Sequence, residues 1–476
     1  MPDTKKFLVA GQWKAASSSF EVKSPYDGAV VATVAAPGPD DVEAAVAAAA
    51  DAFEESRKLP VHRRAEALAH ISARLESRAG EVAETIAAEG GKPLKWAKVE
   101  AARAASTFRW AAEECRREGG EVMRLDTEAA LGARLGIVRR FPLGPVLAIA
   151  PFNFPVNLVA HKMAPALAVG APVVIKPATK TPLGALLLGE LFSETDLPGG
   201  MCSVLPVSGS RAGDLAKDSR FRKISFTGST EVGWRIAAAD PRKVVTLELG
   251  GNAGVIVHSD ADLDRAAQRV AFGGYYQAGQ SCIAVQRVLV HDAVAEDFTT
   301  KLVTEVDKLV TGDPMDPATD VGPLIDRDAL DRVSAWVDDA VQSGAEVLTG
   351  GKREDPFYRP TVLARTRPEM KVRCEEIFGP VVSVGTYAGF DEAIAEVNSS
   401  RYGLQAGVFT SDIDRVLRAH RDIEVGGLIA NDVSSFRADH MPYGGTKDSG
   451  VGREGLRYAM EEMSEPRILV LSNVPL

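Results

Sequence analysis

The chain has 476 residues, 45% of them hydrophobic and 25% charged, which is ordinary for a folded globular protein. This length predicts about two to four domains, and a core large enough to fold without disulfides or metal. The 65 acidic residues outnumber the 55 basic ones, giving a formal net charge of −10. That balance argues against nucleic acid or an anionic membrane as a partner.

The chain up to about Leu131 is predicted to be mostly helical, with one helix ending at Gly90-Gly91 and another spanning about 96–118. From Pro142 onward, short β-rich runs alternate with helical stretches. The predicted strands are Val146–Ala150, Pro172–Lys176, Cys202–Pro206, Lys223–Phe226 and Val244–Leu249. This alternation predicts a mostly parallel sheet covered by helices, with ligands at the carboxyl ends of its strands.

A second α/β pattern follows, and Leu249–Asn252 is the predicted hinge between the two domains. Its predicted strands are Gly254–Val257, Arg287–His291 and Ala406–Phe409, and its helices are Leu263–Tyr275, Ala293–Leu309, Asp391–Val397 and Asp412–His420. Near the end of the chain, Arg467–Ser472 is strongly β-forming. We expect it to be an edge strand that could pair with a neighbouring subunit.

The four cysteines are too far apart for a disulfide scaffold or a zinc cluster. Their sparseness fits a reducing compartment. There is no apolar run long enough for a signal peptide or a membrane span, so we expect a cytoplasmic protein that binds neither membrane nor metal.

Cys282 closes the small-residue loop Gly279-Gln280-Ser281-Cys282, where a substrate has room to approach a nucleophilic thiol. A lone cysteine is, however, more often an inert buried side chain.

Two further side chains have suitable chemistry. Glu248 ends an apolar strand beside Gly250-Gly251, so it is either a general base with a raised pKa or a surface carboxylate. Asn153 lies between two prolines in Pro151–Pro155, so its amide either binds an oxyanion or simply forms a turn.

Ser229 lies in Phe226–Glu231, where a strand gives way to a helix. Small and hydroxylated residues at a helix N-terminus can bind phosphate, although Ser229 could equally be a plain N-cap. No GxGxxG fingerprint follows any of the predicted strands.

Seven motifs in this order resemble the aldehyde dehydrogenase superfamily, from about Phe7 to Ile468. They are PFNFP (151–155), VVIKPATKTP (173–182), ISFTGSTEVG (224–233), LELGGN (247–252), GQSC (279–282), EEIFGP (375–380) and MPYGGTKDSGVGREG (441–455). The resemblance implies two α/β domains with parallel sheets and a β-arm. Residues 1–119 and 143–249 would form the dinucleotide-binding domain and 250–457 the catalytic domain. Residues 120–142 and 458–476 would form an arm that joins subunits into homodimers or homotetramers.

The resemblance also implies a mechanism. Cys282 would attack the aldehyde carbon, and the oxyanion would lie between the Asn153 amide and the Cys282 backbone N–H. After hydride transfer to nicotinamide, Glu248 would activate a water that hydrolyses the thioester. The resemblance implies two roles for Lys176, one among the catalytic residues and one as a contact of the adenosine ribose. The other implied cofactor residues are Ala150, Pro151, Phe152, Thr179, Gly209, Gly213, Phe226, Ser229, Leu249, Glu376 and Phe378.

One departure concerns the choice between NAD and NADP. NAD-preferring relatives often have Glu three positions after the lysine, where this chain has Thr179. Without that carboxylate a 2′-phosphate meets no like charge, so we expect NADP to be accepted.

The expected substrate residues are Phe154, His161, Ser281 and Arg437. Relatives that act on phosphorylated aldehydes often have Arg where Ser281 stands, so one anion clamp is missing. The loop FRADHMPYGG (436–445) resembles the lactaldehyde and glycolaldehyde branch, which favours a small polar aldehyde. Arg437 would hold a substrate carboxylate or hydroxyl, or be a surface or interface residue, and His161 would make the tunnel polar or be structural. Two alternatives remain: a CoA-acylating semialdehyde dehydrogenase and a non-catalytic binding protein that kept the fold.

Overall fold

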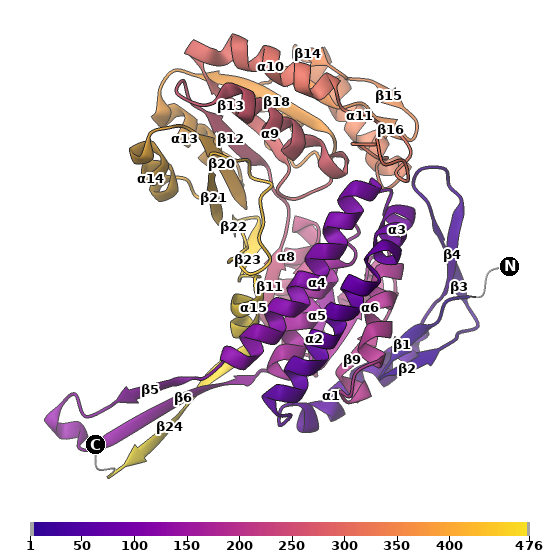
Figure 1. The fold of residues 1–476 in the computed structure, drawn as a ribbon, viewed down its shortest axis with the longest axis vertical. Helices are drawn as coiled ribbons and strands as arrows, with labels where there is room; N and C mark the ends of the chain where they lie inside the picture. The colour runs from indigo at the N-terminus through magenta and orange to yellow at the C-terminus, as the bar shows by residue number, and fades with distance from the viewer. Residues whose placement is uncertain (1–3, 474–476) are drawn as a thin grey trace.

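The computed structural model describes residues 4–473, which form two α/β domains and a projecting arm (Figure 1). The first domain is built on an eight-stranded sheet of order β2-β1-β9-β8-β7-β10-β11-β23. Its strands are β1 (Phe7–Val9), β2 (Gln12–Lys14), β7 (Val146–Ile149), β8 (Val173–Lys176), β9 (Cys202–Val204), β10 (Lys223–Thr227), β11 (Val244–Glu248) and β23 (Gly450–Val451). The strands β7 to β11 are parallel, as predicted, whereas β1, β2 and β23 pair antiparallel.

Eight helices accompany this sheet. They are α1 (Pro39–Ser56), α2 (Val61–Ser77), α3 (Ala79–Gly90), α4 (Leu94–Arg117), α5 (Asn157–Val169), α6 (Leu183–Ser193), α7 (Gly209–Leu215) and α8 (Thr230–Ala239). Every residue of α5 is buried, because α5 lies between the sheet and the long helices α2 and α4. This explains why its sequence is mostly apolar, with Asn157, His161 and Lys162 as the buried exceptions.

The prediction of a mostly helical N-terminal region is wrong for the first strands. Residues before α1 form β1 and β2 of the main sheet and a hairpin of β3 (Ser19–Lys23) with β4 (Val30–Ala35). The strand β1 has only three residues, and its burial depends on pairing with β9, where Leu8 faces Val204. Such a strand is set by distant contacts and carries little local signal.

The second domain has a seven-stranded sheet of order β14-β17-β18-β13-β12-β20-β21, parallel except where β14 meets β17. Its strands are β12 (Ala253–Val257), β13 (Val285–His291), β14 (Glu346–Thr349), β17 (Thr361–Ala364), β18 (Val381–Tyr387), β20 (Gln405–Phe409) and β21 (Gly427–Ala430). Its helices are α9 (Leu263–Tyr275), α10 (Ala295–Asp307), α11 (Arg327–Gln342), α12 (Lys371–Cys374), α13 (Phe390–Asn398) and α14 (Ile413–Asp422). Two short pairs, β15 (Arg353–Glu354) with β16 (Phe357–Tyr358) and β19 (Tyr402–Gly403) with β22 (Thr446–Lys447), complete it.

The chain crosses between the sheets twice. Residues 249–252 lead from β11 into β12, as predicted for the hinge. The chain then returns at β23, which pairs with β11, and α15 (Leu456–Glu462) packs on α4 and α5. Leu456 and Met460 therefore lie in the core of the first domain. The return at Gly450 comes before residue 457, where the sequence places the end of the second domain.

The arm is a three-stranded antiparallel sheet that extends away from both domains (Figure 1). It consists of β5 (Glu121–Arg124), β6 (Arg134–Pro142) and β24 (Ser464–Ser472), with β6 in the middle. Within the chain β24 pairs with β6 along its whole length, so its predicted pairing with another subunit could use only its other edge. None of the helices within residues 4–473 is long and apolar enough to cross a membrane.

Candidate active site

A cavity of about 1260 Å³ lies where the carboxyl ends of β7, β8, β10 and β11 face the second domain. It exceeds the roughly 300–1,000 Å³ typical of small-ligand pockets, so it has room for a dinucleotide and a small substrate. The structure brings all but one of the predicted site residues to its wall. These are Ala150, Pro151, Phe152, Asn153, Phe154, Lys176, Thr179, Gly209, Gly213, Phe226, Ser229, Glu248, Leu249, Ser281, Cys282, Glu376, Phe378 and Arg437. The exception is His161.

The loop that carries Cys282 is held in an unusual backbone conformation. Gln277, Ala278 and Gly279 have φ values of 55°, 54° and 68°, so three successive residues are left-handed. A Cβ on Gly279 would lie 2.1 Å from the carbonyl oxygen of Gly379, which makes glycine the residue that fits there. This strain is typical of functional sites and places Cys282 in the cavity wall.

The hinge packs directly against this loop. A Cβ on Gly251 would lie 2.0 Å from the carbonyl oxygen of Cys282, and the Gly251 N–H donates to Glu376 Oε1 at 2.9 Å. The hinge therefore contacts both the thiol loop and the segment that carries Glu376.

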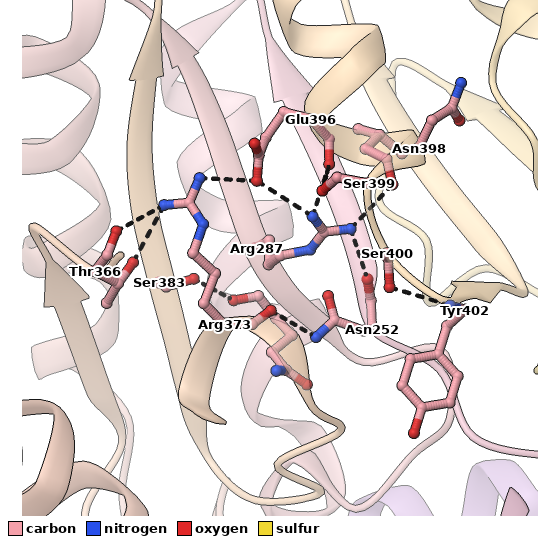
Figure 2. Close-up of polar contacts among 12 residues, drawn as sticks. Asn252, Arg287, Thr366, Arg373, Ser383, Glu396, Asn398, Ser399, Ser400 and Tyr402 are labelled. Atoms are coloured by element: carbon pink, nitrogen blue, oxygen red, sulfur yellow. Dashed lines mark hydrogen bonds and ion pairs between the residues drawn. The ribbon is translucent and has the colours of Figure 1, made fainter. Parts of the chain in front are cut away.

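A buried polar cluster fixes the same junction from behind (Figure 2). The Asn252 amide donates to the carbonyl oxygens of Arg373 and Glu375 at 2.9 and 3.0 Å. Arg287 in turn donates to the Asn252 carbonyl oxygen at 3.2 Å and to the Glu396 carbonyl oxygen at 2.8 Å. The hinge and the Glu376 segment are thus locked together.

The Cys282 thiol is partly exposed to the cavity, and its Sγ lies 3.2 Å from the Tyr443 hydroxyl. Burial raises the pKa of Cys282 to about 12, and the negative charges of Glu376 and Glu248 raise it further. The Tyr443 hydrogen bond and the positive charge of Arg437 oppose this rise. Cys282 therefore needs local stabilisation of its thiolate if it is to act as a nucleophile.

Glu248 ends β11 and is only 2% exposed. Neither of its carboxylate oxygens has a hydrogen-bond partner among the described residues. Burial raises the pKa of Glu248 well above its usual range, and the nearby charge of Glu454 raises it further. A buried carboxylate with open lone pairs and a raised pKa is suited to accept a proton from water.

The Asn153 side chain is tied to the thiol loop. Its side-chain amide donates one hydrogen to the Gln280 backbone carbonyl oxygen at 2.9 Å. The Gln277 side chain donates to the backbone carbonyl oxygen of Asn153 at 2.8 Å. An amide has two N–H donors, so the second can bind a ligand atom. These contacts are more specific than those of an ordinary turn-forming Asn.

Behind Glu248 lies a buried ion network. Lys162 Nζ is 2.7 Å from Glu454 Oε1, and Arg437 Nη2 is 3.0 Å from Glu454 Oε2. Burial alone would raise the pKa of Glu454, but Lys162 and Arg437 outweigh it and hold that pKa at about 2. Glu454 therefore stays charged, whereas Glu248 has a raised pKa, and this difference separates the two carboxylates in function.

Arg437 is buried, so the expectation that it could be a surface residue does not hold. A second arginine, Arg103 on α4, lines the same cavity and donates to Asp439 Oδ1 at 2.8 Å. The Nε atoms of Arg103 and Arg437 have no partner within residues 4–473. The cavity wall therefore carries two arginine side chains, each of which also donates to a buried carboxylate.

His161 departs from its expected place in the substrate tunnel. It is buried outside the cavity wall, with Nε2 2.9 Å from Asp439 Oδ1, the carboxylate that Arg103 also contacts. Burial lowers the pKa of His161 to about 4, so its imidazole is neutral at pH 7. The structure thus favours its structural reading, since α5 directs this side chain toward Asp439 behind the wall.

The other end of the cavity has features suited to a dinucleotide. Ser229 is the N-cap of α8, its side chain makes no capping bond, and it lines the cavity. The N–H groups of the first turn of α8 can therefore bind phosphate. The amino group of Lys176 is mostly buried, which lowers its pKa, whereas Lys180 pairs with Asp326 of the second domain.

The middle of the cavity is flanked by two phenyl rings. Phe378 has φ +46°, a strained value for a bulky residue, and its ring lies edge-on to Phe152 at 5.9 Å. Burial raises the pKa of Glu376 to about 7. No group of three or more His, Cys, Asp or Glu side chains within the described residues could hold a metal ion.

Sequence reasoning missed Arg103 and Tyr443. Arg103 is a charged residue in an alanine-rich helix, close to the buried Ala101, Ala104 and Ala105, and that placement is a usable signal. Tyr443 lies in the quoted motif MPYGG, but nothing in the sequence shows that its hydroxyl reaches Cys282.

Comparisons with known proteins agree with this geometry. The model of the aldehyde dehydrogenase family matches residues 13–469. A 3-sulfolactaldehyde dehydrogenase of Priestia aryabhattai is 44% identical over 465 residues, which are 98% of this chain and 97% of that protein. The chain belongs to the aldehyde dehydrogenase family and is an NAD- or NADP-dependent oxidoreductase that acts on aldehydes.

Two solved structures are similar over their full length. Aldehyde dehydrogenase 21 of Physcomitrella patens, in complex with the reaction product succinate, has a TM-score of 0.98 and 43% identity, covering 100% of this chain and 99% of that one. The glyceraldehyde-3-phosphate dehydrogenase GapN of Methanocaldococcus jannaschii DSM 2661, complexed with NADP, has a TM-score of 0.92 and 36% identity, covering 96% and 100%. The predicted fold class is confirmed, and so is the use of a nicotinamide cofactor.

Proposed function

We propose that the enzyme oxidises a small aldehyde to its carboxylic acid through a thioester on Cys282. The observation that carries this proposal is the meeting of Cys282, Asn153 and the bare carboxylate of Glu248 in one cavity. Thiol, amide donor and base are the three groups that acyl transfer to water requires.

The steps follow from these groups. The Cys282 thiolate attacks the aldehyde carbon, and the resulting oxyanion accepts hydrogen bonds from the Asn153 amide and the Cys282 backbone N–H. A nicotinamide held beside Glu376 and Phe378 would supply the hydride acceptor, and oxidation of that carbon would leave a thioester on Cys282. Glu248 then accepts a proton from a water molecule as that water attacks the thioester carbon. The carboxylic acid leaves, and the Cys282 thiolate is restored.

The residues present fit a dinucleotide. The open first turn of α8 at Ser229 suits the pyrophosphate, and Glu376 and Lys176 suit the two riboses. Thr179 offers a hydroxyl where a carboxylate would repel a 2′-phosphate, and Lys217 and Arg235 add positive charge to the same cavity. These contacts support the acceptance of NADP.

Hydrolysis is favoured over transfer to CoA. Both oxygens of Glu248 are free to accept a proton, and a CoA-acylating enzyme would not need that base. Incubation with aldehyde, cofactor and CoA should therefore yield the free acid. Formation of acyl-CoA as the main product would reverse this choice.

For the substrate we propose a short, polar aldehyde, as the sequence favours, with an anionic group at its far end. Arg103 and Arg437 line the same cavity as Ser281, and both guanidinium groups bring positive charge to its wall. They supply the anion clamp that the sequence seemed to lack at Ser281. The relatives named above act on 3-sulfolactaldehyde or bind succinate, and both molecules carry such a group.

A substrate panel with Arg103→Leu tests this assignment. We expect succinic semialdehyde and 3-sulfolactaldehyde to exceed lactaldehyde and hexanal in kcat/KM with the unmodified enzyme. Losing a hydrogen bond to a charged group costs about 1.5–3 kcal/mol, so Arg103→Leu should lower kcat/KM for the anionic aldehydes roughly 10–100-fold. Lactaldehyde should change only a few-fold. Equal losses for neutral and anionic aldehydes would refute the clamp.

The arm supports assembly into homodimers or homotetramers. Ile468, Leu469 and Val470 of β24 and Val122 of β5 are exposed apolar side chains on this thin sheet. An apolar edge strand of this kind is stabilised when a second copy covers it.

A further inference from the structure

Tyr443 touches the atom on which the proposed chemistry depends. Its hydroxyl lies 3.2 Å from Cys282 Sγ, within hydrogen-bond range for sulfur. The side chain is buried, and it packs with Ile283 and Leu404 in a small apolar cluster that also contacts Cys282. The contact is thus part of the cavity wall.

The position of this hydroxyl is fixed from two sides. The Tyr443 backbone exchanges two hydrogen bonds with Glu454, at 3.0 and 2.7 Å. The Arg437 guanidinium lies 3.8 Å from the centre of the Tyr443 ring and also donates to Glu454 Oε2. Backbone and ring are therefore both anchored to Glu454, which leaves the hydroxyl little freedom to leave Cys282.

The direction of the hydrogen bond follows from proton affinities. Burial raises the pKa of Tyr443 well above its usual value, so the phenol keeps its proton. When Cys282 is a thiolate, only the phenol can donate. A hydrogen bond to a charged acceptor is roughly twice as strong as one to a neutral acceptor, so this contact favours the thiolate.

We propose that Tyr443 is a further catalytic residue, whose hydroxyl donates a hydrogen bond to the Cys282 thiolate and thereby supports the nucleophile. This inference rests on the proposed role of Cys282. The Arg437 cation over the ring strengthens the donor, because it stabilises the partial negative charge that develops on the phenol as its proton is shared with the thiolate. The other charged groups that face Cys282 are Glu248 and Glu376, and both disfavour the thiolate.

The test is the alkylation of Cys282 by iodoacetamide, a neutral reagent, in wild type and Tyr443→Phe. The phenylalanine ring keeps the packing and the contact with Arg437, and only the hydroxyl is lost. Both proteins carry Cys374→Ser, because Cys374 is exposed and would also react. Peptide mass spectrometry then follows modification at Cys282 between pH 6 and 10.

Tyr276→Phe is the matched control. Its residue also lines the cavity, but its hydroxyl donates to Ser281 Oγ at 2.8 Å, whereas Cys282 Sγ is hydrogen-bonded to Tyr443. Thermal unfolding of all three proteins checks that each is folded.

We expect the pKa of the thiol to rise by about one unit in Tyr443→Phe, so the thiolate fraction falls roughly tenfold. The more basic thiolate is intrinsically about threefold more reactive, so the net alkylation rate should fall about three- to fourfold at every pH below the pKa. The pH profile of kcat/KM should shift to higher pH by the same amount as the pKa of the thiol. Tyr276→Phe should keep the wild-type profile.

An unchanged alkylation profile in Tyr443→Phe, or an equal change in Tyr276→Phe, overturns the inference. Alkylation needs no aldehyde turnover. A protein that shows the shift but oxidises no aldehyde would therefore contradict the proposed function and leave the thiol contact supported.

Discussion

Replacing Glu248 by Gln should separate the two halves of the proposed reaction. The variant keeps the shape of the side chain but cannot accept a proton from water. Loss of a general base typically costs about 10²–10⁴-fold, so steady-state kcat should fall by that factor. The first turnover should still release about one NAD(P)H per active Cys282, because formation of the thioester does not use Glu248.

Loss of turnover in this variant should not reflect misfolding. Burial raises the folded-state pKa of Glu248, so its contribution to stability is fully present below about pH 4.5 and is lost as pH rises through the folded pKa. At pH values above the folded-state pKa, each pKa unit by which folding raises the pKa of Glu248 lowers the free energy of unfolding by about 1.36 kcal/mol. Glu248→Gln removes this cost, and the oxygen that becomes an amide nitrogen has no hydrogen-bond partner among the described residues, so the stability of the variant near pH 8 should equal or exceed that of wild type.

Stopped-flow absorbance of reduced cofactor measures the burst, and urea unfolding measures the stability. Hydroxylamine should restore turnover, because this small nucleophile cleaves thioesters without a protein base. Cys282→Ala should show no burst. The rate of thioester hydrolysis in wild type should increase with pH through a pKa above that of an ordinary carboxyl group. A Glu248→Gln enzyme that turns over at the wild-type rate, or that shows neither burst nor turnover while folded, would refute the role of Glu248.

Three further outcomes follow from the structure. Thr179→Glu should shift the kcat/KM ratio from NADP toward NAD by at least about tenfold, because a carboxylate opposes a 2′-phosphate; an unchanged ratio would mean that Thr179 is remote from the 2′ position. Leu469→Asp on β24, 56% exposed, should lower the mass measured by sedimentation, whereas Ile413→Asp, 64% exposed on α14, should not; the reverse pattern would contradict the role of the arm. Lys162→Met removes one partner of the buried Glu454 and should destabilise the fold by about 3–5 kcal/mol in urea, against less than about 1 kcal/mol for Lys301→Met at the surface; equal effects would show that the buried pair contributes little.

The elements that sequence predicted best are those with local signals. The strands predicted at Pro172–Lys176 and Val244–Leu249 are apolar runs that lead into a proline and into two glycines, and the structure has them as β8 and β11, each one residue shorter. The helix predicted at Leu263–Tyr275 has the same bounds as α9, because its apolar period and its Asp262 cap are both local. By contrast β1 is buried only because a distant strand pairs with it, so no local pattern could indicate it.

The same distinction explains what sequence could say about the site. The motifs around Gly251 and Gly279 were visible, but the atoms that require glycine there belong to Cys282 and Gly379, in other motifs. Arg103 was not assigned because its partner, Asp439, lies on a loop far along the chain. Likewise His161 has the spacing of a tunnel residue, but its orientation is decided by that same Asp439. Residue types were therefore readable, whereas their partners required the fold.

The charged residues of the cavity wall show why the net charge of the whole protein does not indicate the charge of its ligands. The protein as a whole carries a formal net charge of −10, which favours neither anionic cofactors nor anionic substrates. Yet the cavity wall holds more basic than acidic residues. The basic ones are Lys92, Lys176, Lys180, Lys217, Arg103, Arg235, Arg269, Arg332 and Arg437, and the acidic ones are Glu100, Asp214, Glu248 and Glu376. Burial raises the pKa of Glu248 and of Glu376, which reduces the negative charge further. Four of these cations, Lys180, Arg103, Arg269 and Arg437, also pair with carboxylates outside this list. The excess of basic groups in the wall still favours an anionic dinucleotide, and it would equally favour the anionic aldehyde proposed above.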